Sequence, residues 1–255
     1  MEYILLFILI VIAVVSYLIH KKNMELLRMV SSPDRGTYSE RRLIIKMLRK
    51  GVHPKAIFHD LYVKRKNGQY SQIDLVVATP QGLLAIEVKD YSGWIFGSER
   101  QKYWTQILNY GKEKYRFYNP IMQNEGHIKA LREQSEQFSV LPIYNIVLFA
   151  GNCTLKDISY ISENRYVGYT SEIMQVIKTV KGFCDAGYTD KREVARVLNK
   201  AVRDGENPEI VSNHLFMAQS AARNNPQPVI NRGFGLYINW RRLLRTAFER
   251  CLNGN

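Results

Sequence analysis

Cysteine is scarce in this sequence, and its spacing offers no metal-binding pair. The chain has 255 residues with three cysteines, at positions 153, 184 and 251, and no C-x-x-C motif. Zinc ribbons depend on such motifs and disulfide-stapled domains on many more cysteines, so both classes are excluded. So few cysteines are typical of a protein in a reducing compartment.

Internal repeats and low-complexity tracts are also lacking, which excludes solenoid and compositionally biased architectures. Hydrophobic residues make up 46% and charged residues 23% of the chain, an ordinary globular composition. A length of 255 residues allows one large domain, alone or with appendages, and an ample core.

Acidic residues are in short supply. The 36 lysines and arginines outnumber the 23 aspartates and glutamates, giving a formal net charge of +13. A surplus of this kind attracts polyanions, which means nucleic acid or the anionic surface of a membrane.

One long apolar run, residues 3–19, stands at the N-terminus and is broken only by Ser16. At 1.5 Å per residue a helix over this run would be roughly 25 Å long, near the short end for a membrane span. A cleaved signal peptide is the alternative. Only Met1 and Glu2 precede the run, however, and no small-x-small cleavage site follows it. We therefore expect an uncleaved transmembrane anchor over residues 1–22.

Basic residues flank this run on its C-terminal side only, at His20, Lys21, Lys22 and Arg28. The positive-inside rule then places the rest of the chain in the cytoplasm. The expectation is a single-pass protein of the inner (cytoplasmic) membrane of a prokaryote.

The pattern beyond the anchor predicts an α/β domain. A helix is expected from Ser39 to Gly51, followed by three antiparallel strands joined by turns at Asn67-Gly68 and Thr79–Gly82. A mixed loop and helix stretch comes next, then a helix over about 122–138 and a buried strand over about 143–151. The chain beyond about residue 170 looks mostly helical.

Three charged residues fall on two of the expected strands. Glu87 and Lys89 share one strand face, and Asp74 lies across the Thr79–Gly82 turn. A loop centred on Pro80-Gln81 puts Asp74 opposite Glu87, and a loop centred on Gln81-Gly82 puts it opposite Lys89. Either loop gathers the three on one face, whereas a three-residue loop without a bulge would separate them.

Two carboxylates can bind a hard divalent ion such as Mg²⁺. The ion would activate water and polarise a phosphoryl group, while the lysine would orient or deprotonate that water and stabilise developing charge. A plain cross-strand salt bridge on a solvated face is the alternative. The apolar runs LVVA and LLAI, however, indicate strands buried on both faces, where charges are unfavourable unless they serve a purpose.

A further acid, Glu40, extends the apolar stripe of the first helix, in register with Leu43, Ile44, Met47 and Leu48. This position predicts a side chain that faces inward, toward the same site. The alternative is an N-terminal acid favoured by the helix dipole.

Together these residues resemble a known family. Asp74, then Glu87-x-Lys89 across a hairpin, with Glu40 on the preceding helix, matches the PD-(D/E)xK nuclease core. Ile73 stands where that motif has proline. The stretches IDLVVATPQGLLAIEVKDYSGWIFGS, YWTQ and NPIMQNEGHIKAL look like the nuclease-related domain, NERD. The resemblance covers about residues 33–152.

The resemblance implies a restriction-endonuclease-like core of α-β-β-β-α-β order and DNA cleavage that depends on Mg²⁺ or Mn²⁺. It gives catalytic roles to Glu40, Asp74, Glu87 and Lys89. The metal ligands it implies are Asp74, Glu87 and the backbone carbonyl of Val88. The residues expected to support the site or to contact nucleic acid are Gln106, Asn119, Gln123, His127 and Lys102.

Several of these residues also have plain structural interpretations. Gln123 and His127 share a helix face and would touch a phosphate or orient Glu87, although His127 could be a structural histidine. Trp94 and Trp104 could stack on bases, but we expect both to be buried. A basic stretch with interleaved tyrosines suits either strand tracking or a solvated surface. It comprises Lys102, Tyr103, Tyr110, Lys112, Lys114, Tyr115, Arg116 and Tyr118.

The chain thus divides into an anchor at 1–22, a juxtamembrane linker at 23–35, a nuclease-like domain at 36–165 and a mostly helical region at 166–255. A helix is expected over 240–252, which could pack on the core, lie on the membrane or bind DNA. The expected function is that of a membrane-anchored, cytoplasm-facing, metal-dependent DNA endonuclease. The alternative is a non-catalytic membrane scaffold that holds nucleic acid or a protein partner.

Overall fold

The computed structural model describes residues 2–156, 158 and 164–224. The helix expected over 240–252 lies outside these residues. A five-stranded sheet forms the centre, in the order β1-β2-β3-β7-β9. Its strands are β1 (Ile57–Lys64), β2 (Tyr70–Thr79), β3 (Gly82–Asp90), β7 (Ile143–Ala150) and β9 (Arg165–Tyr169). The first three are antiparallel, and β7 and β9 join them in parallel.

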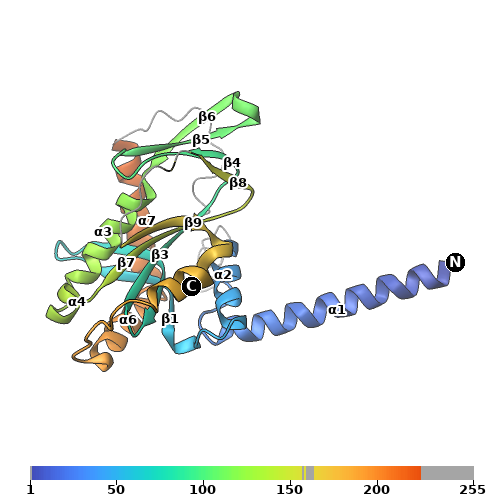
Figure 1. The fold of residues 1–255 in the computed structure, drawn as a ribbon, viewed down its shortest axis with the longest axis horizontal. Coiled ribbons are helices and arrows are strands. Elements are labelled where there is room, and N and C mark those ends of the chain that lie inside the picture. Colours follow the sequence, from blue (N-terminus) through green and yellow to red (C-terminus); the bar gives the residue numbers. More distant parts are fainter. Residues whose placement is uncertain (1, 157, 159–163, 225–255) are drawn as a thin grey trace, which may run out of the picture.

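Helices cover both faces of this sheet (Figure 1). They are α2 (Tyr38–Arg49), α3 (Pro120–Arg132), α4 (Glu136–Val140), α5 (Ile173–Val180) and α6 (Lys191–Asp204). The last described helix, α7 (Pro208–Asn224), contacts β1 through His214, whose ring lies against that of Tyr62. Buried residues of α2 and α5 share one apolar cluster with the sheet, and those of α3, α4 and α6 share the other. Short 3₁₀ turns stand at Pro54–Ala56, Asn109–Gly111 and Thr170–Glu172. The predicted α-β-β-β-α-β order is confirmed as α2-β1-β2-β3-α3-β7.

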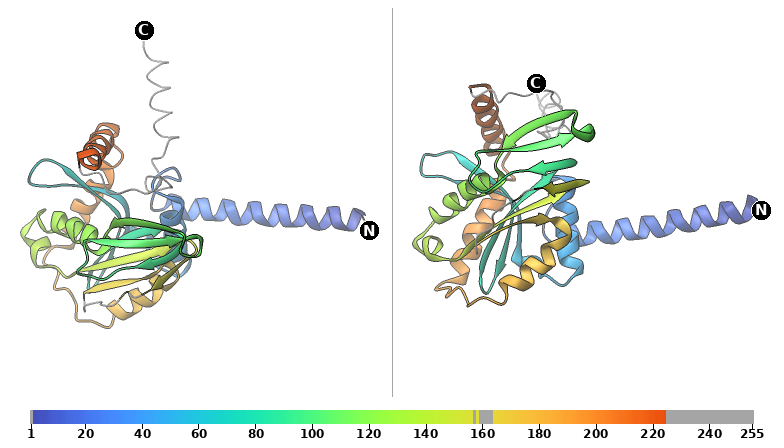
Figure 2. Two further views of the ribbon diagram at one scale, coloured as in Figure 1. Left: turned by 90° about the horizontal axis from the view of Figure 1, so that it is seen from above. Right: turned by 45° about the horizontal axis from the view of Figure 1, so that its top comes forward.

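A second sheet, in the order β6-β5-β4-β8, lies beyond one end of the first (Figure 2). It consists of β4 (Gly93–Phe96), β5 (Tyr103–Leu108), β6 (Glu113–Tyr118) and β8 (Cys153–Lys156). We expected loop and helix here, which was wrong. Trp104 and Phe117 alternate with polar neighbours, a strand pattern, and their rings pack on the core side of this sheet, Trp104 stacked against Phe149.

The N-terminal helix α1 (Glu2–Arg28) extends away from the body (Figure 1). From Tyr3 to Arg28 it is long and apolar enough to cross a membrane, a test that a signal sequence would also pass. The linker expected over 23–35 is helical as far as Arg28. Leu27 is 0% exposed and packs in the core cluster that contains α2. The hydrophobic side chains of Met24 and Leu27 explain the difference, because they continue the helix onto the body.

The boundary expected at 165/166 falls inside β9, a strand of the main sheet. The two helices that follow, α5 and α6, each bury apolar residues against one face of that sheet. This part of the C-terminal region therefore packs against the same sheet as the nuclease-like domain.

Candidate functional site

The site lies where β2 and β3 stop pairing. Their ladder runs from Thr79↔Gly82 to Leu75↔Ile86, so Pro80 and Gln81 form the two-residue loop. The same register would place Asp74 opposite Glu87, the first of the two expected loop geometries. Instead of continuing the ladder, Asp74 Oδ2 accepts a hydrogen bond of 2.8 Å from the backbone N–H of Val88. Asp74 thus lies in the gap where the two strands separate. We call this site, with Asp74, Glu87, Val88 and Lys89, the fork.

On the other side of β2, the neighbouring strand β1 is also distorted next to Asp74. Asp60 stands where the β1–β2 register would oppose Asp74, and its φ is +54°, which is unusual for a residue other than glycine. Arg35 holds it from Nε to Oδ2 at 3.1 Å, and Gln72 donates to Oδ1 at 2.9 Å. Both Arg35 and Asp60 are buried. Our sequence analysis missed this pair, which keeps the strand bent beside the fork.

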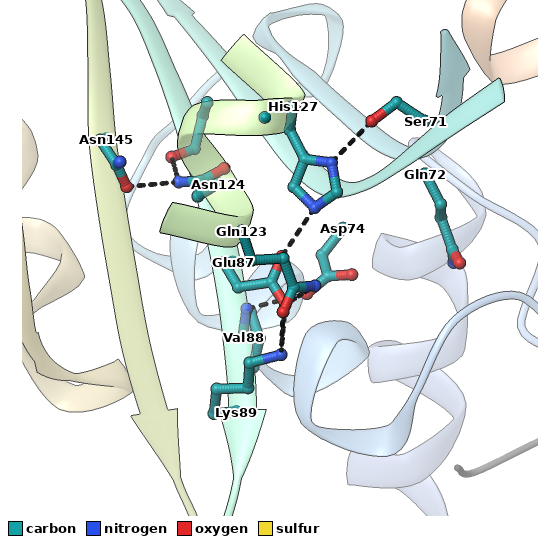
Figure 3. A network of polar contacts seen from close by, with 12 residues as sticks. Ser71, Gln72, Asp74, Glu87, Val88, Lys89, Gln123, Asn124, His127 and Asn145 are labelled. Atoms are coloured by element: carbon teal, nitrogen blue, oxygen red, sulfur yellow. Dashed lines mark hydrogen bonds and ion pairs between the residues drawn. The ribbon is translucent and has the colours of Figure 1, made fainter. Parts of the chain in front are cut away.

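Glu87 is buried, and one of its oxygens is fully engaged. Lys89 Nζ donates to Glu87 Oε1 at 2.6 Å, and Gln123 Nε2 donates to the same oxygen at 2.8 Å. Lys89 Nζ also donates to Gln123 Oε1 at 2.9 Å, which closes a triangle between β3 and α3 (Figure 3). Gln123 therefore orients Glu87, one of the two roles expected for it.

The other oxygen, Glu87 Oε2, points to His127 on α3 (Figure 3). His127 Nε2 lies 3.4 Å away, which is within ion-pair distance if the ring is protonated, but neither buried atom has a hydrogen-bond partner among the described residues. The second ring nitrogen, Nδ1, is 2.8 Å from Ser71 Oγ, which also accepts a hydrogen bond from Arg65. In a neutral ring, the Ser71 hydroxyl can donate its hydrogen to Nδ1. The ring hydrogen is then on Nε2, and this N–H group faces Glu87.

The charges of the fork act strongly on one another. Burial, followed by the charges of Glu87 and Glu40, raises the pKa of Asp74 well above its usual range. Burial alone would also raise the pKa of Glu87, but the Lys89 ammonium and His127 outweigh it and lower this pKa to about 2. Burial would lower the pKa of Lys89, but Glu87, with Tyr91 and Asp74, raises it above its ordinary value. Lys89 is therefore an ammonium at neutral pH in this arrangement.

These features fit a divalent cation. Glu87 Oε2 is a buried oxygen without a hydrogen bond. Asp74 lies beside it, and burial together with the neighbouring negative charges disfavours its ionised form, which a bound cation would stabilise. Within the described part of the chain, no three side chains of His, Cys, Asp or Glu gather as a metal cluster. Two carboxylates are nevertheless enough for Mg²⁺, which keeps several waters and takes substrate phosphate oxygens. The Val88 carbonyl remains an expected third ligand.

Glu40 belongs to a separate network on α2. Its Oε1 accepts a 2.7 Å hydrogen bond from Thr37 Oγ1, and its Oε2 lies 3.0 Å from His59 Nε2. The other nitrogen of the His59 ring lies 2.7 Å from Ser31 Oγ. A side chain at Gly36 would collide with this pair, since a Cβ there would come within 2.3 Å of Glu40 Oε2. Glu40 points inward as expected, but both its oxygens are engaged, and sequence reasoning missed His59.

The remaining expected residues lie away from the fork. Asn119 is fully buried, caps α3 by accepting from Ile121 N–H, and donates to three carbonyls of residues 98–101. Gln106 donates to Ser92 O and holds β5 to the chain that leaves β3. Lys102 lies over the Tyr103 ring on the second sheet. Trp104 is buried as expected, whereas Trp94 is 41% exposed, so its expected burial was wrong.

A mixed α/β core that splits around Asp74 and Glu87, with Lys89 beside them, defines a nuclease-like protein. Residues 35–150 match the family model of the nuclease-related domain, NERD. A protein of Bacillus anthracis described as uncharacterized is 32% identical over 164 residues, covering 64% of this chain and 73% of that protein. The chain belongs to the NERD family. No solved structure matches it significantly.

Proposed function

We propose that this protein is a divalent-metal-dependent endonuclease that hydrolyses DNA phosphodiester bonds. One observation carries the proposal: Glu87 has one oxygen fixed by Lys89 and Gln123 and a second, buried and without a hydrogen bond, beside Asp74. Leaving a buried carboxylate oxygen unbonded is unfavourable, so such atoms call for an explanation such as an ion. Nuclease-related chemistry is what the family assignment supports, and the metal is Mg²⁺ or Mn²⁺ in this proposal.

The residues of the fork and their neighbours on α3 would have separate roles in catalysis. Asp74, Glu87 Oε2 and the Val88 carbonyl would hold the ion, whose chemistry is to activate a water and polarise the phosphoryl group. Lys89, as an ammonium, would stabilise negative charge on the phosphate oxygens rather than remove a proton. Gln123 and His127 would hold Glu87 in place, because Gln123 contacts one of its oxygens and His127 faces the other.

Nucleic acid as the substrate is supported by the outer face of the second sheet, the side away from Trp104. Register places on this outer face the residues Trp94, Phe96, Tyr103, Lys114, Arg116, Tyr118 and Lys156. Trp94 and Tyr118 are 41% and 43% exposed, and Lys114, Arg116 and Lys156 are exposed too. On such a surface the aromatic rings can stack on bases, and the cations between them can contact phosphates. The face begins at β4, only a short chain segment from Lys89.

The N-terminal helix supports membrane attachment in the same proposal. Its apolar part is exposed throughout, because no other described residue covers it. Basic residues follow it on one side only, at Lys21, Lys22 and Arg28, which favours a body in the cytoplasm. The proposed protein is thus an anchored, single-pass nuclease of the inner membrane.

The test is cleavage by the full-length protein purified in detergent. Supercoiled plasmid and circular single-stranded DNA would each be incubated with Mg²⁺, with Mn²⁺ or with a chelator. The matched control is the double variant Asp74→Ala/Glu87→Ala, purified identically to expose any contaminating nuclease. We expect metal-dependent cleavage by the wild type alone. Salt-sensitive DNA binding without cleavage of either substrate would instead favour the non-catalytic scaffold.

A further inference from the structure

A second charged site lies on the other side of α2 from its buried stripe. There α2 and the end of α1 enclose a groove of about 1240 Å³, which extends to the ends of β3 and β7. Four cations of α2 and its C-cap Lys50 line it together with His20 of α1; we call this the basic groove. The five cations are Arg41, Arg42, Lys46, Arg49 and Lys50. None of the assigned roles of the nuclease fork uses them.

The cations of the basic groove have no carboxylate partner in the described part of the chain. Within the described residues none of the five forms an ion pair with a carboxylate. The one carboxylate that lines the groove, Asp90, accepts a hydrogen bond from Ser39. Burial and the neighbouring charge of Lys50 lower the pKa of Lys46. Like charges therefore crowd here, and an anion would relieve them.

Other contacts hold several of these side chains in position. Lys46 Nζ donates to the carbonyls of Thr170 and Ser171 at 3.1 and 2.7 Å. Arg41 donates to the carbonyls of Arg35 and Gly36, and Arg42 lies over the Tyr38 ring. Side chains fixed in this way lose less entropy when they bind a ligand. Arg49 and Lys50, at the end of α2, are exposed and free to close on it.

The position of the groove along α1 indicates which anion it meets. The apolar run ends at Ile19, and the groove is lined by His20, Asn23 and Met24. These residues follow the run by about 1.5–7.5 Å along the helix axis, which is the depth of the headgroup layer beside a bilayer core. Leu27, buried in the core, fixes α1 to the body, so the groove cannot drift from this level.

We propose that the basic groove binds the phosphate headgroup of an anionic phospholipid. This inference rests on the membrane anchoring of the proposed function, but not on its catalysis. Binding would set α2 against the inner leaflet and so fix the orientation of the fork, which lies beyond the same helix, relative to the membrane. Charge complementarity with anionic lipid is the usual basis for recognition by basic pockets of this kind.

The experiment measures lipid binding to the full-length protein in detergent, without metal or DNA. Native mass spectrometry would follow titrations with phosphatidylglycerol and with phosphatidylcholine of the same acyl chains. The test variant is Arg42→Gln/Arg49→Gln/Lys50→Gln. The control, Lys129→Gln/Arg192→Gln/Arg196→Gln, removes the same charge from exposed positions of α3 and α6. Circular dichroism would compare their folding, and Arg42→Lys/Arg49→Lys would test whether charge alone suffices.

We expect the wild type and the control to prefer phosphatidylglycerol, and the test variant to bind it about tenfold or more weakly, the effect of one lost charge-assisted hydrogen bond. The lysine variant should retain the preference. No preference in the wild type, or a preference that the test variant keeps, would overturn the proposal. So would a test variant that loses DNA binding instead, since the groove would then serve nucleic acid. Release of the protein from membranes by alkaline carbonate would contradict the anchor itself, separately from the groove.

Discussion

Glu87 and Glu40 are both buried carboxylates, and they differ in what bonds their oxygens. Thr37 and His59 take up both oxygens of Glu40, in a network that ends at Ser31. Glu87 has Lys89 and Gln123 on one oxygen and no hydrogen bond on the other. A fully satisfied buried network stabilises a fold, whereas a partly satisfied one is unfavourable without a ligand. The comparison favours Glu87 as the residue that holds an ion, while the catalytic role that the resemblance implies for Glu40 stays a prediction.

The largest expected effect contrasts Glu87→Gln with Glu40→Gln. Glu87→Gln should lower the cleavage rate by about 1,000-fold or more, because the ion it would hold supplies several kcal/mol to the transition state. Glu40→Gln should retain cleavage within about tenfold but lose about 1–3 kcal/mol of stability, since a buried charge-assisted hydrogen bond is disturbed. Plasmid cleavage and urea unfolding of both variants would measure this. Loss of cleavage in a well-folded Glu40→Gln would make Glu40 catalytic after all.

The second contrast lies within the fork. Lys89→Ala should lower cleavage by about 100-fold yet leave Mn²⁺ binding largely intact, because an ammonium stabilises charge but does not ligate the metal. Asp74→Ala should lose both, since it removes a metal oxygen. Calorimetric titration with Mn²⁺ under conditions without DNA would separate the two. Equal metal binding by Asp74→Ala and the wild type would exclude Asp74 as a ligand.

The two histidines sharpen the comparison further. His59 is fully buried with both nitrogens bonded, so His59→Ala should destabilise the fold by about 3 kcal/mol through a cavity and unpaired partners. His127 Nε2 makes no hydrogen bond and lies 3.4 Å from Glu87 Oε2, so His127→Ala should lower cleavage by about 10–100-fold, as expected for a residue that supports a metal site. Thermal unfolding and initial rates, measured in parallel, would check both. Loss of cleavage in a stable His59→Ala, with loss of stability but normal cleavage in His127→Ala, would mean that His59 supports catalysis and His127 the fold.

Much of the fork was predictable because it depends on strand parity and turn chemistry. Asn67-Gly68 and Pro80-Gln81 fix the two hairpins, and alternation then brings Asp74, Glu87 and Lys89 together. What the sequence could not disclose depends on contacts between distant segments. Asp60 has a positive φ, and its carboxylate is paired with Arg35, which is distant in the sequence. The hydrogen bonds of Glu40 likewise depend on a distant residue, His59 of β1, which is in turn hydrogen-bonded to Ser31.

The second sheet was missed for a related reason. Its strands are short, and aromatic residues at alternate positions are interrupted by lysines and by the turn at Asn109–Gly111. Their strand character comes from packing, since Trp104 and Phe117 cover the end of the main core. The same alternation that buries these rings turns Arg116 and Trp94 outward. The sequence showed the basic and aromatic residues but not that they share one face.

The smallest expected effect concerns this outer face, which touches neither carboxylate network. Arg116→Gln should weaken DNA binding only modestly and lower the slope of log affinity against log salt by about 0.9 for duplex DNA, one phosphate contact. Arg196→Gln, the same change at an exposed position of α6, should leave the slope unchanged. Fluorescence anisotropy of a labelled duplex across a salt series would measure both, with a chelator present to prevent cleavage. Because the fork is untouched, the cleavage rate at saturating DNA should match the wild type. A lower saturated rate would mean that the outer face positions the reacting phosphate, and an unchanged slope would mean that DNA approaches the fork by another surface.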